Sequence, residues 1–142
     1  MRNAALIDSG PIVALFNASD RWHRPCVDGL KNYSGQLVTT WPVIAEAAHL
    51  LSFAIAAQTA VLDWVERGGL RVEHLVVEDV AYIKARMKKY SDLPMDLADA
   101  SLMCIAERLE INGIMTIDRD FSIYRTLKGK PLTGVLKTGK RR

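Results

Sequence analysis

Residues 94–121 read PMDLADASLMCIAERLEINGIMTIDRDF, and this stretch decides the fold expected for the whole chain. Apolar residues cover almost every side of residues 96–110, which predicts a largely buried helix. Asp96 and Asp99 lie three residues apart in its first turn, where like charges repel each other. Unpaired carboxylates in apolar surroundings are costly, so the pair predicts a positive charge nearby. A divalent cation would stabilise these carboxylates far more than the helix N-terminus does.

An apolar strand expected at residues 114–117 follows this helix and ends at Asp118. The same order occurs near the start of the chain, where the apolar run Ala4–Ile7 precedes Asp8. Short continuous apolar runs are typical of central strands in a parallel sheet. Parallel strands present their carboxyl ends at one edge, where open α/β sheets place their sites. We therefore expect both carboxylates to lie at that edge, although an Asp after a strand can also simply cap the next helix.

The rest of the chain alternates expected helices and strands, which predicts an α/β fold. Glu46 is the only Asp, Glu, Lys or Arg between Trp41 and Leu62, a pattern that favours a carboxylate in a pocket over one on a solvated helix face. Further strands are expected at residues 36–40, 70–75 and 132–136, and further helices at 11–16, 19–33, 43–57, 58–67 and 78–89.

Length and composition predict one globular domain, which we place at residues 1–136, with a basic tail at 137–142. The net charge of +3 is compatible with a polyanionic partner, although mildly basic proteins are common. Cys26 and Cys104 lack CxxC spacing, which indicates reduced, buried thiols. We expect neither a signal peptide nor a membrane span, because polar residues interrupt the apolar run at 43–62. A cytoplasmic location follows as the expectation.

The candidate site residues offer only oxygen ligands, which suits Mg²⁺ or Mn²⁺ together with substrate phosphate. No Ser or Cys nucleophile has a paired His, and no GxxxxGK[ST] loop is present. Metal-assisted hydrolysis of a phosphodiester bond fits these residue types.

Four segments carry a resemblance to a known family: LIDSG at residues 6–10, the isolated Glu46, LADASL at 97–102 and TIDRDF at 116–121. In this order and with comparable spacing, they resemble the four acidic motifs of the PIN-domain nucleases. The match covers essentially the whole chain. Its length and motif style resemble the VapC-type toxins of toxin–antitoxin pairs.

The resemblance implies a three-layer α/β/α fold with a mainly parallel five-stranded sheet. It also implies a Mg²⁺- or Mn²⁺-dependent endoribonuclease that acts on cellular RNA, forms a homodimer and is neutralised by a VapB-type antitoxin. Carried over by position, the catalytic and metal-binding acids are Asp8, Glu46, Asp99 and Asp118. Supporting roles fall to Asp96 and Asp120, as further ligands or as groups that contact the ligands, and to Ser9 and Thr116, as holders of carboxylates or water.

Three other functions remain open at the level of sequence. The chain can be a non-catalytic RNA-binding or regulatory PIN module, or a solitary PIN nuclease without an antitoxin. A phosphotransfer domain is less favoured, because it needs a further acid directly after the first strand. Here Asp8 is followed by Ser9, Gly10 and Pro11.

Overall fold

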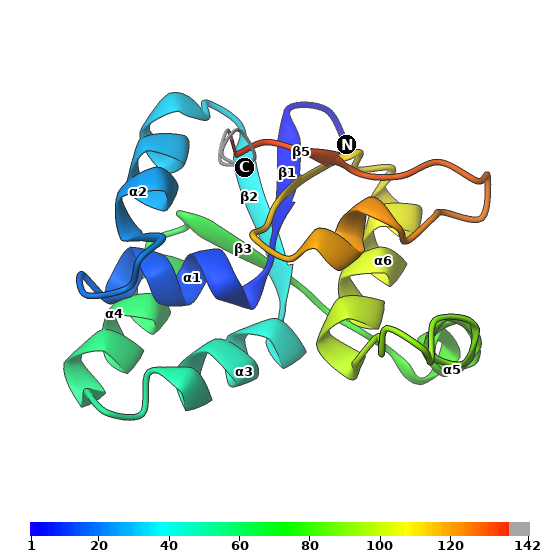
Figure 1. Cartoon of the computed structure of the whole chain (residues 1–142), viewed down its shortest axis with the longest axis horizontal. Coiled ribbons are helices and arrows are strands. Elements are labelled where there is room, and N and C mark those ends of the chain that lie inside the picture. Colours follow the sequence, from blue (N-terminus) through cyan, green and yellow to red (C-terminus); the bar gives the residue numbers. More distant parts are fainter. Residues whose placement is uncertain (137–142) are drawn as a thin grey trace.

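A computed structural model describes residues 1–136, and the predicted basic tail at residues 137–142 lies outside the described part. Every strand pairing in its five-stranded sheet is parallel. Helices cover both faces of the sheet, so the predicted three-layer α/β/α fold is confirmed (Figure 1). In the spatial order β3-β2-β1-β4-β5, the strands are β3 Leu70–Glu73, β2 Gln36–Thr40, β1 Ala4–Ile7, β4 Gly113–Met115 and β5 Thr133–Gly134.

Six α-helices and two short 3-10 helices connect the strands within residues 1–136. Helices α1, α2 and α4 lie on one side of the sheet and α5 and α6 on the other, while α3 contacts both α1 and α6 (Figure 1). The helices are α1 Ser9–Phe16, α2 His23–Asn32, α3 Trp41–Leu50, α4 Ile55–Glu66, α5 Val80–Lys89 and α6 Leu97–Leu109, with the 3-10 helices η1 Val77–Asp79 and η2 Arg119–Ser122.

The central strand β1 positions the functional edge of the sheet. The chain leaves β1 towards β2 and β3 on one side, whereas β4 and β5 extend the sheet on the other. The carboxyl ends of β1 and β4 therefore flank a topological switch point, where open α/β sheets bind ligands. Ile7 pairs with Met115, so the residues that follow, Asp8 and Thr116, lie side by side.

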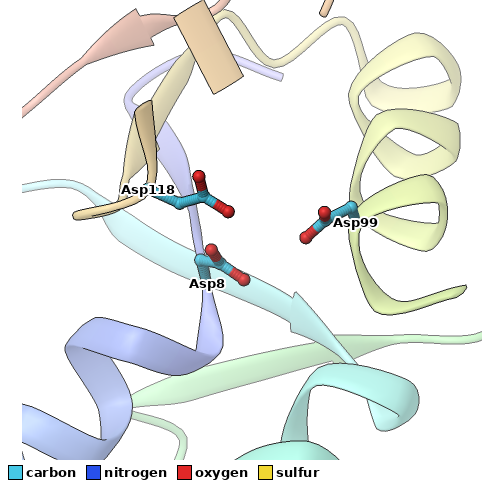
Figure 2. Close-up of side chains that lie close together, drawn as sticks. All are labelled: Asp8, Asp99 and Asp118. Atoms are coloured by element: carbon cyan, nitrogen blue, oxygen red, sulfur yellow. The ribbon is translucent and has the colours of Figure 1, made fainter. Parts of the chain in front are cut away.

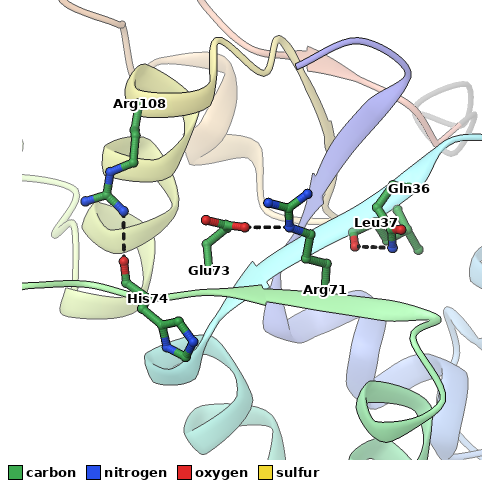
Figure 3. A network of polar contacts seen from close by, with 6 residues as sticks. All are labelled: Gln36, Leu37, Arg71, Glu73, His74 and Arg108. Atoms are coloured by element: carbon green, nitrogen blue, oxygen red, sulfur yellow. Dashed lines mark hydrogen bonds and ion pairs between the residues drawn. The ribbon is translucent and has the colours of Figure 1, made fainter.

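Helix α6 is held against the sheet by polar contacts at two points along its length. Near its start, the hydroxyls of Ser101 and Thr40 are 2.7 Å apart, and both side chains are fully buried. Near its end, Arg108 Nη1 donates to the carbonyl oxygen of His74 at 2.8 Å, just beyond β3 (Figure 3). A helix fixed in this way carries its first turn to the carboxyl edge of β2.

The single helix predicted at residues 43–57 is wrong, because α3 ends at Leu50 and α4 begins at Ile55. Gln58 Nε2 donates to the carbonyl oxygen of Ala48 at 2.7 Å, so α4 supplies a partner for a carbonyl in the last turn of α3. The apolar spacing continues through the break, and no Gly or Pro marks it. In the part of the chain that the structure describes, no helix is long and apolar enough to cross a bilayer.

Three strands end in different places from those predicted. Strand β4 ends before Thr116 because the Thr116 hydroxyl accepts the backbone N–H of Asp118 at 2.9 Å, which turns the chain. The strand predicted at 114–117 is therefore shorter at its carboxyl end. Strands β3 and β5 are also shorter than the predicted ranges 70–75 and 132–136.

Helix α2 starts later than predicted, at His23 rather than near residue 19. The side chains of Asn17 and Asp20 accept the backbone N–H groups of Ser19 and Trp22 at 3.1 and 2.8 Å. Such side-chain turns compete with helical hydrogen bonding, which explains the delay. The remaining predicted helices are present with small shifts at their ends.

Candidate metal centre at the carboxyl edge of the sheet

Three of the predicted site residues form one carboxylate cluster. Asp8, Asp99 and Asp118 each offer an oxygen atom, and these oxygens all lie within 4.8 Å of one another. Asp8 and Asp118 follow β1 and β4, and they face Asp99 on α6 (Figure 2). Asp8 and Asp99 are only 5% and 7% exposed, whereas Asp118 is more exposed. The cluster is therefore buried on the Asp8 and Asp99 side and reaches solvent beside Asp118.

Local hydrogen bonds orient the Asp8 carboxylate. Asp8 caps α1, because its Oδ1 accepts the backbone N–H of Ser9 at 2.8 Å. Its other oxygen, Oδ2, accepts the hydroxyl of Thr116 at 3.2 Å. The capping role expected as the alternative to a functional role is thus present alongside membership of the cluster. Thr116 contacts both neighbouring acids, since its hydroxyl also accepts the backbone N–H of Asp118.

Asp99 lies in the first turn of α6, and Asp96 caps that helix. The Asp96 carboxylate is exposed and accepts the backbone N–H of Asp99 at 2.8 Å. Asp96 does not belong to the three-carboxylate cluster. Its observed contact is therefore that of a helix cap, which also places a second negative charge near Asp99.

Glu46 reaches the cluster through Ser9. The Ser9 hydroxyl donates to Glu46 Oε1 at 2.8 Å, and Glu46 lies close enough to Asp8 for their charges to interact. Glu46 is half-buried and lies outside the group of three. Asp120 is also outside it, and its backbone N–H donates to Asp118 Oδ1 at 2.9 Å.

The electrostatics of the cluster disfavour negative charge. Burial raises the pKa of Asp8 to about 7, the charges of Asp118 and Glu46 add to the rise, and the Ser9 and Thr116 hydrogen bonds oppose it. Burial, followed by the charges of Asp8 and Asp96, raises the pKa of Asp99 to about 8. A metal-free site would therefore retain protons near neutral pH.

The cluster fits a hard divalent cation. Its donors are carboxylate oxygens from three separate elements, the ligand type that Mg²⁺ and Mn²⁺ prefer. The two ion pairs in residues 1–136, Arg71–Glu73 and Arg108–Asp79, lie elsewhere, so no Lys or Arg side chain within that range forms an ion pair with these acids. A bound cation would replace the retained protons and remove the repulsion between the carboxylates.

One member of the site has no counterpart in the sequence interpretation. The Tyr124 hydroxyl donates to Asp99 Oδ2 at 3.0 Å, and the Tyr124 side chain is fully buried. Its position in the chain, shortly after Asp118 and Phe121, is the only signal that associates it with the site.

No family model matches the chain. Ribonuclease VapC26 of Mycobacterium tuberculosis is 26% identical over 131 residues, which is 90% of this chain and 97% of that protein.

Two crystal structures share the fold. VapC20 of Mycobacterium tuberculosis, described as a sarcin–ricin loop cleaving toxin, has a TM-score of 0.75 and 20% identity over 89% of this chain and 99% of its own. VapBC2 of Rickettsia felis, bound to a DNA fragment from their promoter, has a TM-score of 0.61 and 12% identity over 92% of this chain and 96% of its own. The acidic motifs and the nearly full-length match to a VapC protein agree with this fold, and the chain is similar to VapC-type members of the PIN-domain family.

Proposed function

We propose that this protein is a Mg²⁺- or Mn²⁺-dependent endoribonuclease that acts as the toxin of a toxin–antitoxin pair. The observation that carries the proposal is the cluster of Asp8, Asp99 and Asp118 at the switch point of the sheet. The names of VapC26, a ribonuclease, and VapC20, a toxin that cleaves the sarcin–ricin loop, support RNA as the substrate.

The burial of the cluster favours catalysis over a purely RNA-binding role. Asp8 and Asp99 are nearly fully buried, and burial is the largest cause of their raised pKa values. A binding module would gain nothing from this unfavourable arrangement, since RNA is itself negatively charged. A cation site, in contrast, needs closely spaced carboxylates as ligands for the ion.

The chain's own residues divide the chemistry between them. When bound, Mg²⁺ or Mn²⁺ supplies positive charge at the scissile phosphate and acidifies a water molecule. Asp8, Asp99 and Asp118 would hold the ion. Thr116 links Asp8 and Asp118 through hydrogen bonds and so fixes their relative positions. Ser9 holds Glu46 Oε1, which leaves Glu46 Oε2 to receive the proton of the attacking water.

The partners and the location are part of the same proposal. A VapB-type antitoxin is the expected protein partner, supported by the VapC names of the relatives and by the VapBC2 structure. We further propose a homodimer that acts in the cytoplasm, where its RNA substrate is found. The free, buried thiols of Cys26 and Cys104 are compatible with a reducing compartment.

The test is cleavage of a structured RNA pool by the purified protein with Mg²⁺, Mn²⁺ or EDTA. Any co-purified antitoxin is first removed by denaturation and refolding. Asp8→Asn and Asp99→Asn are compared with Asp63→Asn, an exposed carboxylate on α4, as the matched control. We expect cleavage by the wild type and the control only, and only with a divalent metal.

Two results would contradict the proposal. Cleavage that persists in EDTA, or in both cluster variants, would mean that another site or a contaminant performs the reaction. If the protein, freed of any antitoxin, binds RNA tightly but cleaves it with neither Mg²⁺ nor Mn²⁺, the non-catalytic module would be favoured.

A further inference from the structure

Tyr124 is a buried aromatic residue with a single polar contact on its hydroxyl. It has no exposed surface, and its ring packs edge-on against Tyr90 and Phe121, each with a centroid distance of 5.0 Å. The hydroxyl is directed out of this aromatic cluster towards α6, where it donates to Asp99 Oδ2 at 3.0 Å. The packed ring therefore aims the hydroxyl at one carboxylate.

This hydrogen bond is the specific contact that orients Asp99. Among the residues that the structure describes, Tyr124 is the only side chain that hydrogen-bonds the Asp99 carboxylate. An ionised carboxylate only accepts hydrogen bonds, so the hydroxyl is the donor. With Oδ2 held by Tyr124, the rotation of the carboxylate is restricted, and Oδ1 remains for another ligand.

Tyr124 also belongs to the segment that carries Asp118. The backbone N–H of Asp120 donates to Asp118 Oδ1 at 2.9 Å, and the backbone N–H of Tyr124 donates to the Asp120 carbonyl oxygen at 3.1 Å. One short turn thus begins with a cluster carboxylate and ends with a donor to another. The contact with Asp99 joins the β4 side of the cluster to α6.

Apart from the Tyr124 contact, the distance from Asp99 to Asp8 and Asp118 is set only by how α6 packs in the fold. Asp8 and Asp118 are joined locally through Thr116, whereas Asp99 comes from a helix on the other side of the site. A single hydrogen bond across this gap is well placed to set the spacing of the three ligands.

We propose that Tyr124 is a positioning residue that orients Asp99 and sets its spacing from Asp118 for binding of the divalent cation. This inference rests on the metal site of the proposed function. Partners that orient metal ligands without touching the metal typically change metal affinity by about 10–100-fold when they are removed.

The experiment compares Tyr124→Phe with Tyr90→Phe in the full-length protein. Both changes remove one hydroxyl from the same aromatic cluster and keep the ring. The Tyr90 hydroxyl instead accepts the backbone N–H of Arg125 at 2.9 Å, which makes Tyr90→Phe a matched control. Mn²⁺ binding is measured by the loss of the free-ion electron paramagnetic resonance signal, and thermal unfolding in EDTA confirms that both variants are folded.

We expect Tyr124→Phe to weaken Mn²⁺ binding by about 10-fold or more and Tyr90→Phe to change it by less than about 2-fold. Equal affinities in wild type and Tyr124→Phe would overturn the inference and leave the metal site intact. A wild type that binds no Mn²⁺ would overturn both the inference and the proposed metal dependence.

A second measurement needs no change at Tyr124. A cation bound to Asp99 alters the charge beside the Tyr124 hydroxyl, so saturating Mg²⁺ is expected to produce a tyrosine difference band in the near-ultraviolet spectrum. The band should persist in Tyr90→Phe. A flat difference spectrum in a wild type shown to bind metal would overturn the inference, even if Tyr124→Phe did not fold.

Discussion

Replacing Asp8 with Asn is expected to stabilise the metal-free protein, because it removes a charge that the fold disfavours. The pKa of Asp8 rises from its ordinary 3.8 to about 7. At about 1.4 kcal/mol per pKa unit, this rise lowers the free energy of unfolding by about 4 kcal/mol once the carboxylate is ionised. Asn caps helices as well as Asp does, so the contact with the Ser9 N–H is retained. The amide nitrogen that replaces Oδ2 cannot accept the Thr116 hydroxyl, so the loss of this hydrogen bond offsets part of the gain and leaves roughly 2–4 kcal/mol.

The pH dependence of this difference identifies its cause. Between about pH 4 and pH 7 the folded wild type holds a proton at Asp8 that the unfolded chain has lost, so wild-type stability falls as pH rises. The advantage of the Asp8→Asn variant should be small at pH 4 and complete above about pH 7.

Urea denaturation in EDTA, followed by tryptophan fluorescence at pH 4 and pH 8, measures the free energy of unfolding of both proteins. Saturating Mg²⁺ should then stabilise the wild type and have little effect on the variant, because binding to the folded state raises stability. A variant less stable than the wild type by the same amount at both pH values would refute the reasoning. The charge of Asp8 would then not be the unfavourable element.

Three further predictions follow from the same structure. Thr116→Val removes the hydroxyl that contacts Asp8 and the Asp118 N–H, so Mn²⁺ affinity measured by calorimetry should fall about 10-fold; an unchanged affinity would contradict this role. The pKa values of Asp8 and Asp99 are raised to about 7 and about 8, so protons compete with the metal for these carboxylates. The Mn²⁺ affinity of the wild type should therefore rise ~10-fold or more from about pH 6 to pH 8. An affinity that does not change with pH would argue against these acids as ligands. Glu110 ends α6 with φ of +53°, a left-handed conformation that favours glycine, so Glu110→Gly should raise the free energy of unfolding by about 1 kcal/mol in urea denaturation; a lower midpoint would contradict it.

The parts of the fold that the sequence predicted correctly are those with local causes. Strands Ala4–Ile7 and Gln36–Thr40 are present with the predicted bounds, because short apolar runs between polar turns specify a buried strand without further information. The expectation that Asp8 and Asp118 meet at one edge was also confirmed. It needed only the rule that parallel strands share their carboxyl ends.

Predictions failed where side-chain contacts that the apolar pattern does not record decide the outcome, both in local turns and between elements. The division between α3 and α4 depends on Gln58 reaching the Ala48 carbonyl, a contact that apolar periodicity does not record. The separate places of Asp96 and Asp99 have a similar origin. Both were expected to bind metal, and the structure places one in the cluster and the other at the exposed helix cap.

The sequence by itself determined the parallel α/β architecture and the identity of the acids that gather at its edge, since hydrophobic runs and the residues at their ends are properties of the chain. Only the tertiary structure decided which acids share a site and what orients them. Asp99 joins the cluster because α6 packs on β2 through Ser101, and Tyr124 orients it because an aromatic cluster aims its hydroxyl. Such contacts join residues far apart in the chain, and their geometry arises only when the core is packed.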